Sequence, residues 1–253
     1  MASTGSETEM KYLLIVASEG RAAPEEVAVM QREIPGWAEE MERRGVLLLG
    51  RPLDPPETAA TAATVRVRDG QTMVTDGPFT EAKEWIAGFD LVECSDLDEA
   101  IEVAAKAPVS WFKTIEIRPF ADGPWLDEQA SAFGRWEDGA ARPYLLAVWT
   151  SATAAVSSGD RTVTRAAEAW RQDLQARGLH ILGGALEGAD TATTLRVRDG
   201  KTLLGDGPFV KTGEFIAGID VVSCADGQEA IQLAAAHPAA RHHAIEVRSF
   251  QSG

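Results

Sequence analysis

Cysteine is scarce in this chain of 253 residues, which contains only Cys94 and Cys224. Two thiols so far apart in sequence exclude a disulfide-rich scaffold and a thiolate metal site. No hydrophobic run approaches the roughly 20 residues that cross a bilayer, and residues 1–9 lack the basic start and apolar stretch of a signal peptide. The sequence therefore predicts a cytoplasmic protein with a short disordered leader and no membrane association.

Positive charge is also in short supply. The chain has 24 Lys and Arg against 39 Asp and Glu, which gives a formal net charge of −15. This balance repels phosphate backbones, so we expect no nucleic acid among the partners. Phosphate-binding glycine loops, nucleophile elbows and Cys/His sets with metal-ligand spacing are missing as well, and we expect neither a metal nor a cofactor.

What the sequence does contain is an internal repeat. Residues 64–79 read TVRVRDGQTMVTDGPF, and residues 194–209 read TLRVRDGKTLLGDGPF. Further matches on both sides predict two domains, a first repeat at residues 10–120 and a second repeat at residues 143–251. A polar linker at residues 121–142 joins them.

The linker and the charge distribution both carry information. Trp125, Phe133 and Trp136 lie in the linker, and three aromatic residues predict that it packs onto a domain. Residues 1–120 hold 12 basic and 22 acidic side chains, whereas residues 143–253 hold 10 and 12. The first repeat is therefore strongly acidic and the second is nearly neutral.

Each repeat reads as strand, helix, strand, hairpin, strand, helix, strand. Residues 11–17 form the apolar run of a buried strand, and Asp69-Gly70 predicts a two-residue hairpin turn. Pro35 predicts a kink or a restart inside the first helix. This order predicts an α+β fold with both helices on one face of an antiparallel sheet, and two copies would cover each other's bare faces.

Several phrases of the first repeat resemble the DGPF-type branch of the YCII-related family. They are VRVRDG at residues 65–70, DGPF at 76–79 and IEIRP at 115–119, and close matches recur in the second repeat. The resemblance implies ferredoxin-like βαβββαβ units that form an intramolecular dimeric α+β barrel. Some family members resemble cofactor-independent lyases of the dehydrochlorinase kind, and others are encoded beside extracytoplasmic-function sigma factors.

A His/Asp pair has been proposed as the active site in the shorter branch of that family. Counting back from Gly45 places Ile34 at the position of this histidine, and Ala167 occupies it in the second repeat. The dyad of the shorter branch therefore does not transfer to this chain.

Three side chains are candidates for acid/base chemistry. Asp76 and Asp206 each precede Gly-Pro in a tight turn, where burial at the mouth of a pocket would raise the carboxyl pKa; alternatively, each accepts hydrogen bonds from its own turn. His180 begins a strand and is the best-placed histidine for proton transfer near neutral pH, with a structural role as the alternative. His242 and His243 point to opposite faces if they begin the last strand, and are then poor co-ligands.

Candidate ligand contacts occur as matching residues in the two repeats. They are Arg66, Arg68, Glu84 and Trp37 in the first repeat and Arg196, Arg198, Glu214 and Trp170 in the second. Each arginine pair shares one face of a strand, where it either clamps an anion or faces solvent. The glutamates either share a proton across the repeats or lie on the surface, and the tryptophans either stack on a ligand or belong to the core.

Together these features predict a barrel that binds a small molecule, anionic if the arginines contact it, in a pocket between the repeats. One hypothesis is a cofactor-free lyase or isomerase that uses Asp76 or Asp206 as its acid/base. The alternative is a non-catalytic sensor or accessory protein, for example a partner of a sigma factor, whose acidic first repeat docks a basic protein. A homodimer of the whole chain is compatible with both hypotheses.

Overall fold

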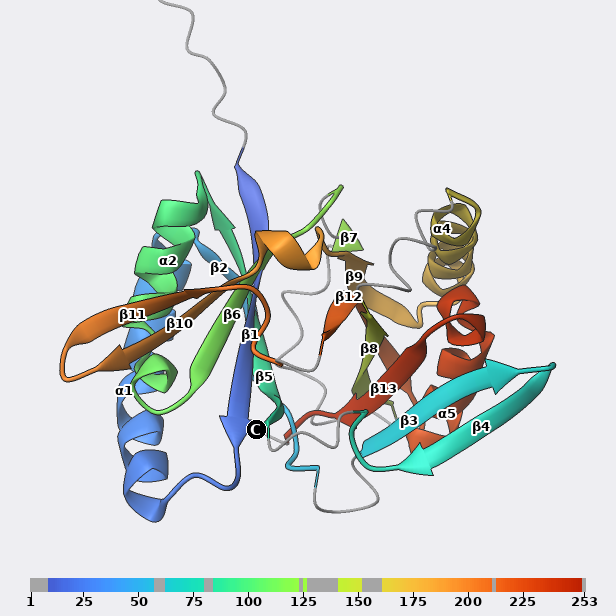
Figure 1. Cartoon of the computed structure of the whole chain (residues 1–253), viewed down its shortest axis with the longest axis horizontal. Coiled ribbons are helices and arrows are strands. Elements are labelled where there is room, and N and C mark those ends of the chain that lie inside the picture. Colours follow the sequence, from blue (N-terminus) through green and yellow to red (C-terminus); the bar gives the residue numbers. More distant parts are fainter. Residues whose placement is uncertain are drawn as a thin grey trace, which may run out of the picture.

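The structure is a computed structural model that describes residues 9–56, 62–79, 84–122, 125–126, 141–151, 161–210 and 213–251 (Figure 1). The first repeat contains β1 (Met10–Glu19), α1 (Pro24–Arg43), β2 (Leu47–Pro52), β3 (Ala62–Arg68), β4 (Gln71–Asp76), β5 (Glu84–Cys94), α2 (Leu97–Lys106), the 3₁₀-helix η1 (Pro108–Trp111) and β6 (Thr114–Pro119). These elements follow the predicted order.

The second repeat has the same succession of elements. It contains β8 (Arg142–Ser151), α4 (Arg161–Ala176), β9 (His180–Ala185), η4 (Ala189–Thr191), β10 (Thr193–Arg198), β11 (Lys201–Asp206), β12 (Glu214–Cys224), α5 (Gly227–Ala236), η5 (Pro238–Arg241) and β13 (Ala244–Ser249). The short strand β7 (Trp125–Leu126) lies in the linker. The predicted packing of the linker aromatics falls outside the described side chains. None of the helices within the described ranges has the length and apolar character needed to span a bilayer.

Local sequence signals explain where these elements begin and turn. Asp96 caps α2, because its side chain accepts a hydrogen bond from the backbone N–H of Glu99 at 2.9 Å. Asp69 and Gly70 both adopt positive φ, as a type I′ hairpin turn requires. The prediction of a kink or restart at Pro35 is wrong as to the restart, because α1 runs through this residue as a single helix.

Each repeat contributes four strands to a ferredoxin-like sheet, and the two sheets close into a barrel. The strand order is β6-β1-β5-β2 in one sheet and β13-β8-β12-β9 in the other. Isolated bridges then join Leu53 to Phe250 and Phe120 to Leu186, at the two edges where the sheets meet. The predicted α+β fold, an intramolecular dimeric α+β barrel, is confirmed.

The hairpins are exchanged between the repeats, which the sequence did not predict. The β3–β4 hairpin of the first repeat pairs with β13 of the second, and the β10–β11 hairpin of the second repeat pairs with β6 of the first. Leu53 and Leu186, which make the two bridges, carry the chain from one sheet to the other before each hairpin. In Figure 1 the β3–β4 hairpin accordingly lies beside β13, far from α1 and α2.

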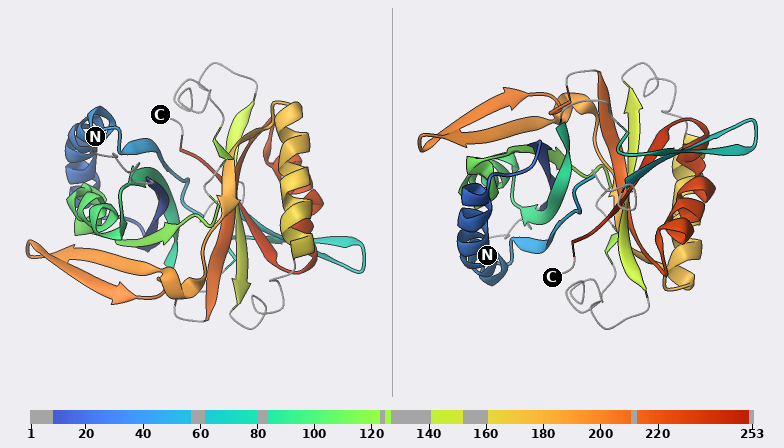
Figure 2. Two further views of the ribbon diagram at one scale, coloured as in Figure 1. Left: turned by 90° about the horizontal axis from the view of Figure 1, so that it is seen from above. Right: turned by 90° about the horizontal axis from the view of Figure 1, so that it is seen from below.

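The molecule has four layers, with the two sheets inside and the helices outside (Figure 2). Side chains of both repeats fill the space between the sheets, including Leu13, Phe89, Leu145 and Val221. The space between the two sheets is therefore packed with side chains, as is usual for a barrel of about eight strands.

Two buried ion pairs lie in this seam. Glu246 accepts hydrogen bonds from Arg248 Nη1 at 3.0 Å, from Trp149 Nε1 at 2.8 Å and from the backbone N–H of Phe79 at 3.3 Å. Glu116, Arg118 and Phe209 repeat this arrangement in the other repeat. Each DGPF phenylalanine is thus held through its backbone by a glutamate of the opposite repeat.

Candidate anion-binding site

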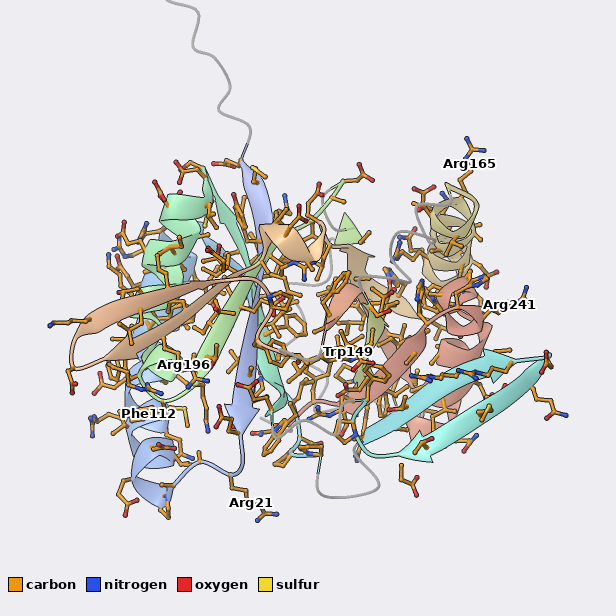
Figure 3. The ribbon with its side chains drawn as sticks, viewed as in Figure 1. Arg21, Phe112, Trp149, Arg165, Arg196 and Arg241 are labelled. Carbon is orange, nitrogen blue, oxygen red and sulfur yellow. The ribbon has the colours of Figure 1, made fainter. Side chains whose placement is uncertain are left out.

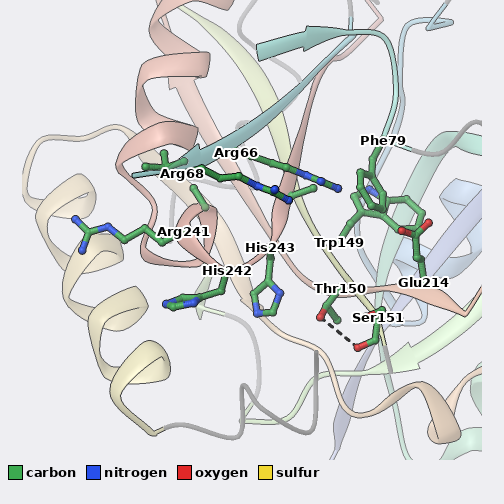
Figure 4. Close-up of a pocket in the computed structure, with 13 residues that line it drawn as sticks. Arg66, Arg68, Phe79, Trp149, Thr150, Ser151, Glu214, Arg241, His242 and His243 are labelled. Atoms are coloured by element: carbon green, nitrogen blue, oxygen red, sulfur yellow. Dashed lines mark hydrogen bonds between the residues drawn. The ribbon is translucent and has the colours of Figure 1, made fainter. Parts of the chain in front are cut away.

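A cavity of about 410 Å³ lies where the exchanged β3–β4 hairpin meets the second repeat (Figure 4). The first repeat contributes side chains from β3 and from the segment after β4. The second contributes the end of β8, the start of β12, and the segment that leads from η5 into β13. The lining residues that matter for its chemistry are Arg66, Arg68, Phe79, Trp149, Glu214, Arg241, His242 and His243. Both repeats are therefore needed to build this site.

The two arginines of β3 enter the cavity together. Arg66 and Arg68 project in the same direction because they are two positions apart on a strand (Figure 4). The guanidinium of Arg66 lies 5.2 Å from the centre of the Phe79 ring. Within the described part of the chain, neither arginine makes an ion pair or a hydrogen bond. The predicted arginine pair is thus available to a ligand.

The equivalent arginines of the second repeat are occupied. Arg196 donates to Thr114 Oγ1 and forms ion pairs with Glu19 at 3.2 Å and Glu84 at 3.3 Å. Arg198 donates to the backbone carbonyl of Trp111. In Figure 3 Arg196 accordingly lies over the first repeat, to the left of Trp149, which lines the cavity.

Comparing the repeats residue by residue explains the difference. The positions of Glu19 and Thr114, which hold Arg196, correspond to Ser151 and Ala244 beside Arg66. Ser151 cannot form an ion pair and Ala244 cannot form a side-chain hydrogen bond. This difference between the repeats can be read from the sequence, although only the exchanged hairpins bring the relevant residues together.

Two histidines line the same cavity. His242 and His243 have ring centres 6.3 Å apart and both contribute to the lining. The condition under which they would point to opposite faces is not met, because β13 begins at Ala244 and the histidines lie in the turn before it. Burial, together with the charges of His242 and His237, lowers the pKa of His243, so this ring is neutral at pH 7.

The charge of the lining is positive. The lining contains three arginines and one carboxylate, Glu214, which makes an interaction of its own. Arg241 points away from Arg66 and Arg68 in Figure 4, so the β3 pair is the part of this charge directed into the cavity. Phe79, Trp149, Val67, Ala240 and Ala244 supply an apolar surface beside the charge. This combination suits an anion attached to an apolar body.

The aspartates predicted as acid/base groups lie elsewhere. Asp76 and Asp206 end the exposed strands β4 and β11, and neither lines the cavity. The structure therefore places them at the surface and not at the mouth of a buried pocket.

His180 lies in a buried cluster of the second repeat, outside the cavity. At the centre of the cluster is Asp220, whose side chain is 0% exposed. Arg171 contacts both carboxylate oxygens, at 2.6 and 3.2 Å, and His180 Nε2 lies 2.8 Å from Oδ1. His237 Nε2 lies 3.5 Å from Oδ2. Burial alone would raise the pKa of Asp220, but Arg171 and the histidines hold it well below its usual range.

The first repeat has the same carboxylate without its partners. Asp90 corresponds to Asp220, while Ala38, Leu47 and Ala107 stand where Arg171, His180 and His237 would be. Asp90 has no hydrogen bond or ion pair with another described residue, and burial raises its pKa to about 7. Sequence reasoning missed both aspartates. The sequence signal is a glycine on the neighbouring strand opposite each aspartate, Gly50 opposite Asp90 and Gly183 opposite Asp220, where a Cβ would lie 2.1 Å from the carboxylate oxygen Oδ1.

The remaining predicted contacts lie away from the cavity. Trp170 packs against His237 with ring centres 4.6 Å apart, and Trp37 is half-buried beside the helical core of the first repeat. Glu84 is engaged by Arg196, whereas Glu214 lines the cavity, so the structure does not pair the two carboxylates. Among the residues that the structure describes, no group of three or more His, Cys, Asp or Glu side chains is placed to hold a metal ion.

Comparison with known proteins adds a family to this geometry. The model of the YCII-related domain matches residues 10–122 and 145–251. "Uncharacterized protein R00369" of Rhizobium meliloti (strain 1021) is 46% identical over 68 residues, which are 26% of this chain and 53% of the relative. The chain thus spans about half the length of this curated relative. The solved structure of "Putative Chlorite dismutase TA0507" aligns over 97% of this chain and 96% of its own, with a TM-score of 0.46 and 8% identity.

Proposed function

Because both repeats of this chain belong to the YCII-related domain family, we propose that one of two equivalent positions in the duplicated fold has been kept as a binding site for a small organic anion. The observation that supports this most directly is the contrast between the arginine pairs. Arg66 and Arg68 line a cavity and make no ion pair or hydrogen bond with another described residue, whereas Arg196 and Arg198 are bonded to protein groups. A carboxylate on an apolar or aromatic body is the ligand that suits arginines beside Phe79.

The proposal is tested by titrating the full chain with benzoate in a calorimeter. We expect one benzoate per chain, weaker binding of acetate because it lacks the apolar body, and loss of affinity at high salt. A stoichiometry of two, or no binding of either anion, would contradict the proposal.

Substitution of one arginine provides the matched comparison. Arg68→Ala is expected to weaken benzoate binding tenfold or more, because a charge-assisted hydrogen bond contributes about 1.5–3 kcal/mol. Arg198→Ala removes the same residue type from the equivalent position of the other repeat, where it contacts Trp111, and is expected to change affinity less than twofold. Equal losses in the two variants would show that the effect is general and not specific to the cavity.

The proposal concerns binding and carries the sensor or accessory role forward ahead of a lyase or isomerase. The packed barrel interior and the exposed positions of Asp76 and Asp206 favour this order. In this role, occupancy of the cavity is the signal, and turnover of a bound carboxylate by the purified chain would contradict it. The DGPF branch of the family remains part of the proposal, and its motif supplies Phe79 to the cavity wall.

A further inference from the structure

We infer that the buried side chains of Asp220 and His237 position one wall of the anion site, the segment Arg241–His243 at the end of η5. We call this pair of residues the brace and this segment the η5 wall. This inference rests on the proposed function, because the wall matters only if the cavity binds a ligand. The brace links the cluster around Asp220, which lies outside the cavity, to the turn that carries Arg241, His242 and His243 into it.

One hydrogen bond fixes the tautomer of His237. Its Nδ1 accepts the backbone N–H of Ala239 at 3.1 Å, so Nδ1 carries no proton. In the neutral ring the proton must therefore be on Nε2, which lies 3.5 Å from Asp220 Oδ2. The carboxylate favours this tautomer electrostatically, and Arg171 holds the carboxylate in place with two contacts.

The hydrogen bond between His237 Nδ1 and the N–H of Ala239 is linked to the cavity wall through Ala239. His237 is the N-cap of η5, and the turn continues with the backbone N–H groups of His242 and His243 donating to Ala239 O at 2.9 and 2.8 Å. Ala239 is thus held by the side chain of His237 on one side and holds both histidines on the other. A change at His237 is transmitted to two residues of the cavity through a single residue.

The first repeat shows what replaces this brace. Its η1 turn has Ala107 at the N-cap with no side-chain bond, yet it follows a similar backbone path. There the turn is held by other contacts, because Arg198 of the exchanged hairpin donates to Trp111 O and the buried Ser110 Oγ donates to Ala105 O of α2.

Within the described residues, neither of these two contacts has an equivalent around η5. Arg68 stands at the position of Arg198 and makes no bond within the described residues, and Ala240 replaces Ser110. Because His237 holds the η5 turn, Arg68 is not needed for the contact that Arg198 makes with η1, and it can bind a ligand. For this reason the brace and an arginine that makes no bond within the described residues occur in the same repeat.

The experiment measures amide hydrogen exchange in the full chain without ligand. His237→Ala is expected to raise the exchange rates of Ala239, His242 and His243 at least tenfold. His237→Asn is expected to restore only part of the protection, because an asparagine oxygen can accept the N–H two residues ahead but does not reproduce the contact of Nε2 with Asp220. His180→Leu, which removes another contact of Asp220 and introduces the residue found at Leu47, is expected to leave these three rates within threefold.

The outcomes separate the brace from the proposed function. Unchanged exchange in His237→Ala would overturn the brace, whether or not the wild-type chain binds benzoate. Increased exchange with unchanged benzoate affinity would overturn its role in positioning the wall, since we expect at least a fivefold loss of affinity in His237→Ala that His237→Asn recovers in part. Protection at Ala239 lost equally in His180→Leu would overturn the specific path through His237. Failure of the wild-type chain to bind benzoate, with exchange as expected, would reject the anion site and with it the purpose of the brace.

Discussion

Replacing Glu246 by glutamine is expected to lower the free energy of unfolding by about 3–5 kcal/mol, because it leaves a buried guanidinium without its counter-charge. Arg248 is 0% exposed, and Glu246 is its carboxylate partner. The same carboxylate also accepts from Trp149 and from the backbone of Phe79, and an amide oxygen cannot satisfy all three donors with the same strength. Urea unfolding of wild type and variant measures the effect.

Two control variants test whether the loss of stability comes from the buried ion pair. Glu102→Gln breaks an exposed ion pair with Lys106, in which both side chains are 55% exposed, and should change stability far less than Glu246→Gln because water screens the pair. Glu116→Gln removes the equivalent carboxylate of the other repeat and should cost somewhat less than Glu246→Gln, because it leaves Arg118 without its counter-charge but has no tryptophan donor to lose. A small loss for Glu246→Gln, comparable with that for Glu102→Gln, would contradict a structural role for the buried pair.

Only one of these two buried glutamates contacts residues that line the cavity. Glu246 holds Phe79 and Trp149, which line the cavity, whereas Glu116 holds Phe209 on the other side. In variants that remain folded, benzoate affinity is therefore expected to fall with Glu246→Gln and to stay near the wild-type value with Glu116→Gln.

Replacing Asp90 by asparagine is expected to stabilise the chain at pH 8, by up to about 4 kcal/mol. Burial raises the pKa of Asp90 to about 7, whereas an unfolded aspartate has a pKa of about 3.9. Between these values the folded chain holds a proton that the unfolded chain has released. The contribution of Asp90 to stability is therefore lost as the pH rises from about 4 to 7, and asparagine removes this loss.

The equivalent substitution in the second repeat should have the opposite sign. Asp220 has a lowered pKa because Arg171 and the histidines stabilise its charge, so Asp220→Asn is expected to destabilise the chain at pH 8. Urea midpoints measured from pH 4 to 8 test both variants. Stabilisation that does not grow between pH 4 and 7 in Asp90→Asn would show that the carboxyl is ionised in the folded chain.

Local signals in the sequence were sufficient for most of the fold. The apolar run at β1, the cap at Asp96 and the turn at Asp69-Gly70 depend on neighbours within a few residues, and each appears as predicted. The internal repeat then indicated that two copies of the same sheet pack against each other. The restart considered at Pro35 does not occur, because a single lost hydrogen bond can be tolerated inside a helix of 20 residues.

The hairpin exchange could not be predicted in this way. Whether β3 pairs with β6 or with β13 depends on where the loop after β2 leads, and both strands present nearly the same residues, with Ile115-Glu116 in one and Ile245-Glu246 in the other. A repeated sequence contains no local information that distinguishes the near copy of a strand from the far one.

The same limit applies to the site. Arg66 and Arg68 were correctly placed on one face of a strand, but their surroundings come from the other repeat and include His242 and His243. The aspartates that attracted attention belong to a conspicuous motif, whereas the buried Asp220 follows an ordinary strand pattern. Its partners lie 40 and 49 residues away for His180 and Arg171, a separation that sequence periodicity cannot bridge.

The exchanged hairpins also bear on how such a chain can evolve. In a dimer of identical subunits every substitution appears at both sites, so neither site can be closed without closing the other. Once the two copies are fused, Ser151 and Glu19 can differ, and one arginine pair is sequestered while the other stays open. Because each sheet borrows a hairpin from the opposite copy, the copies remain mutually dependent, and a gene cut within the linker would encode two fragments that complete each other's sheets, neither carrying a whole site.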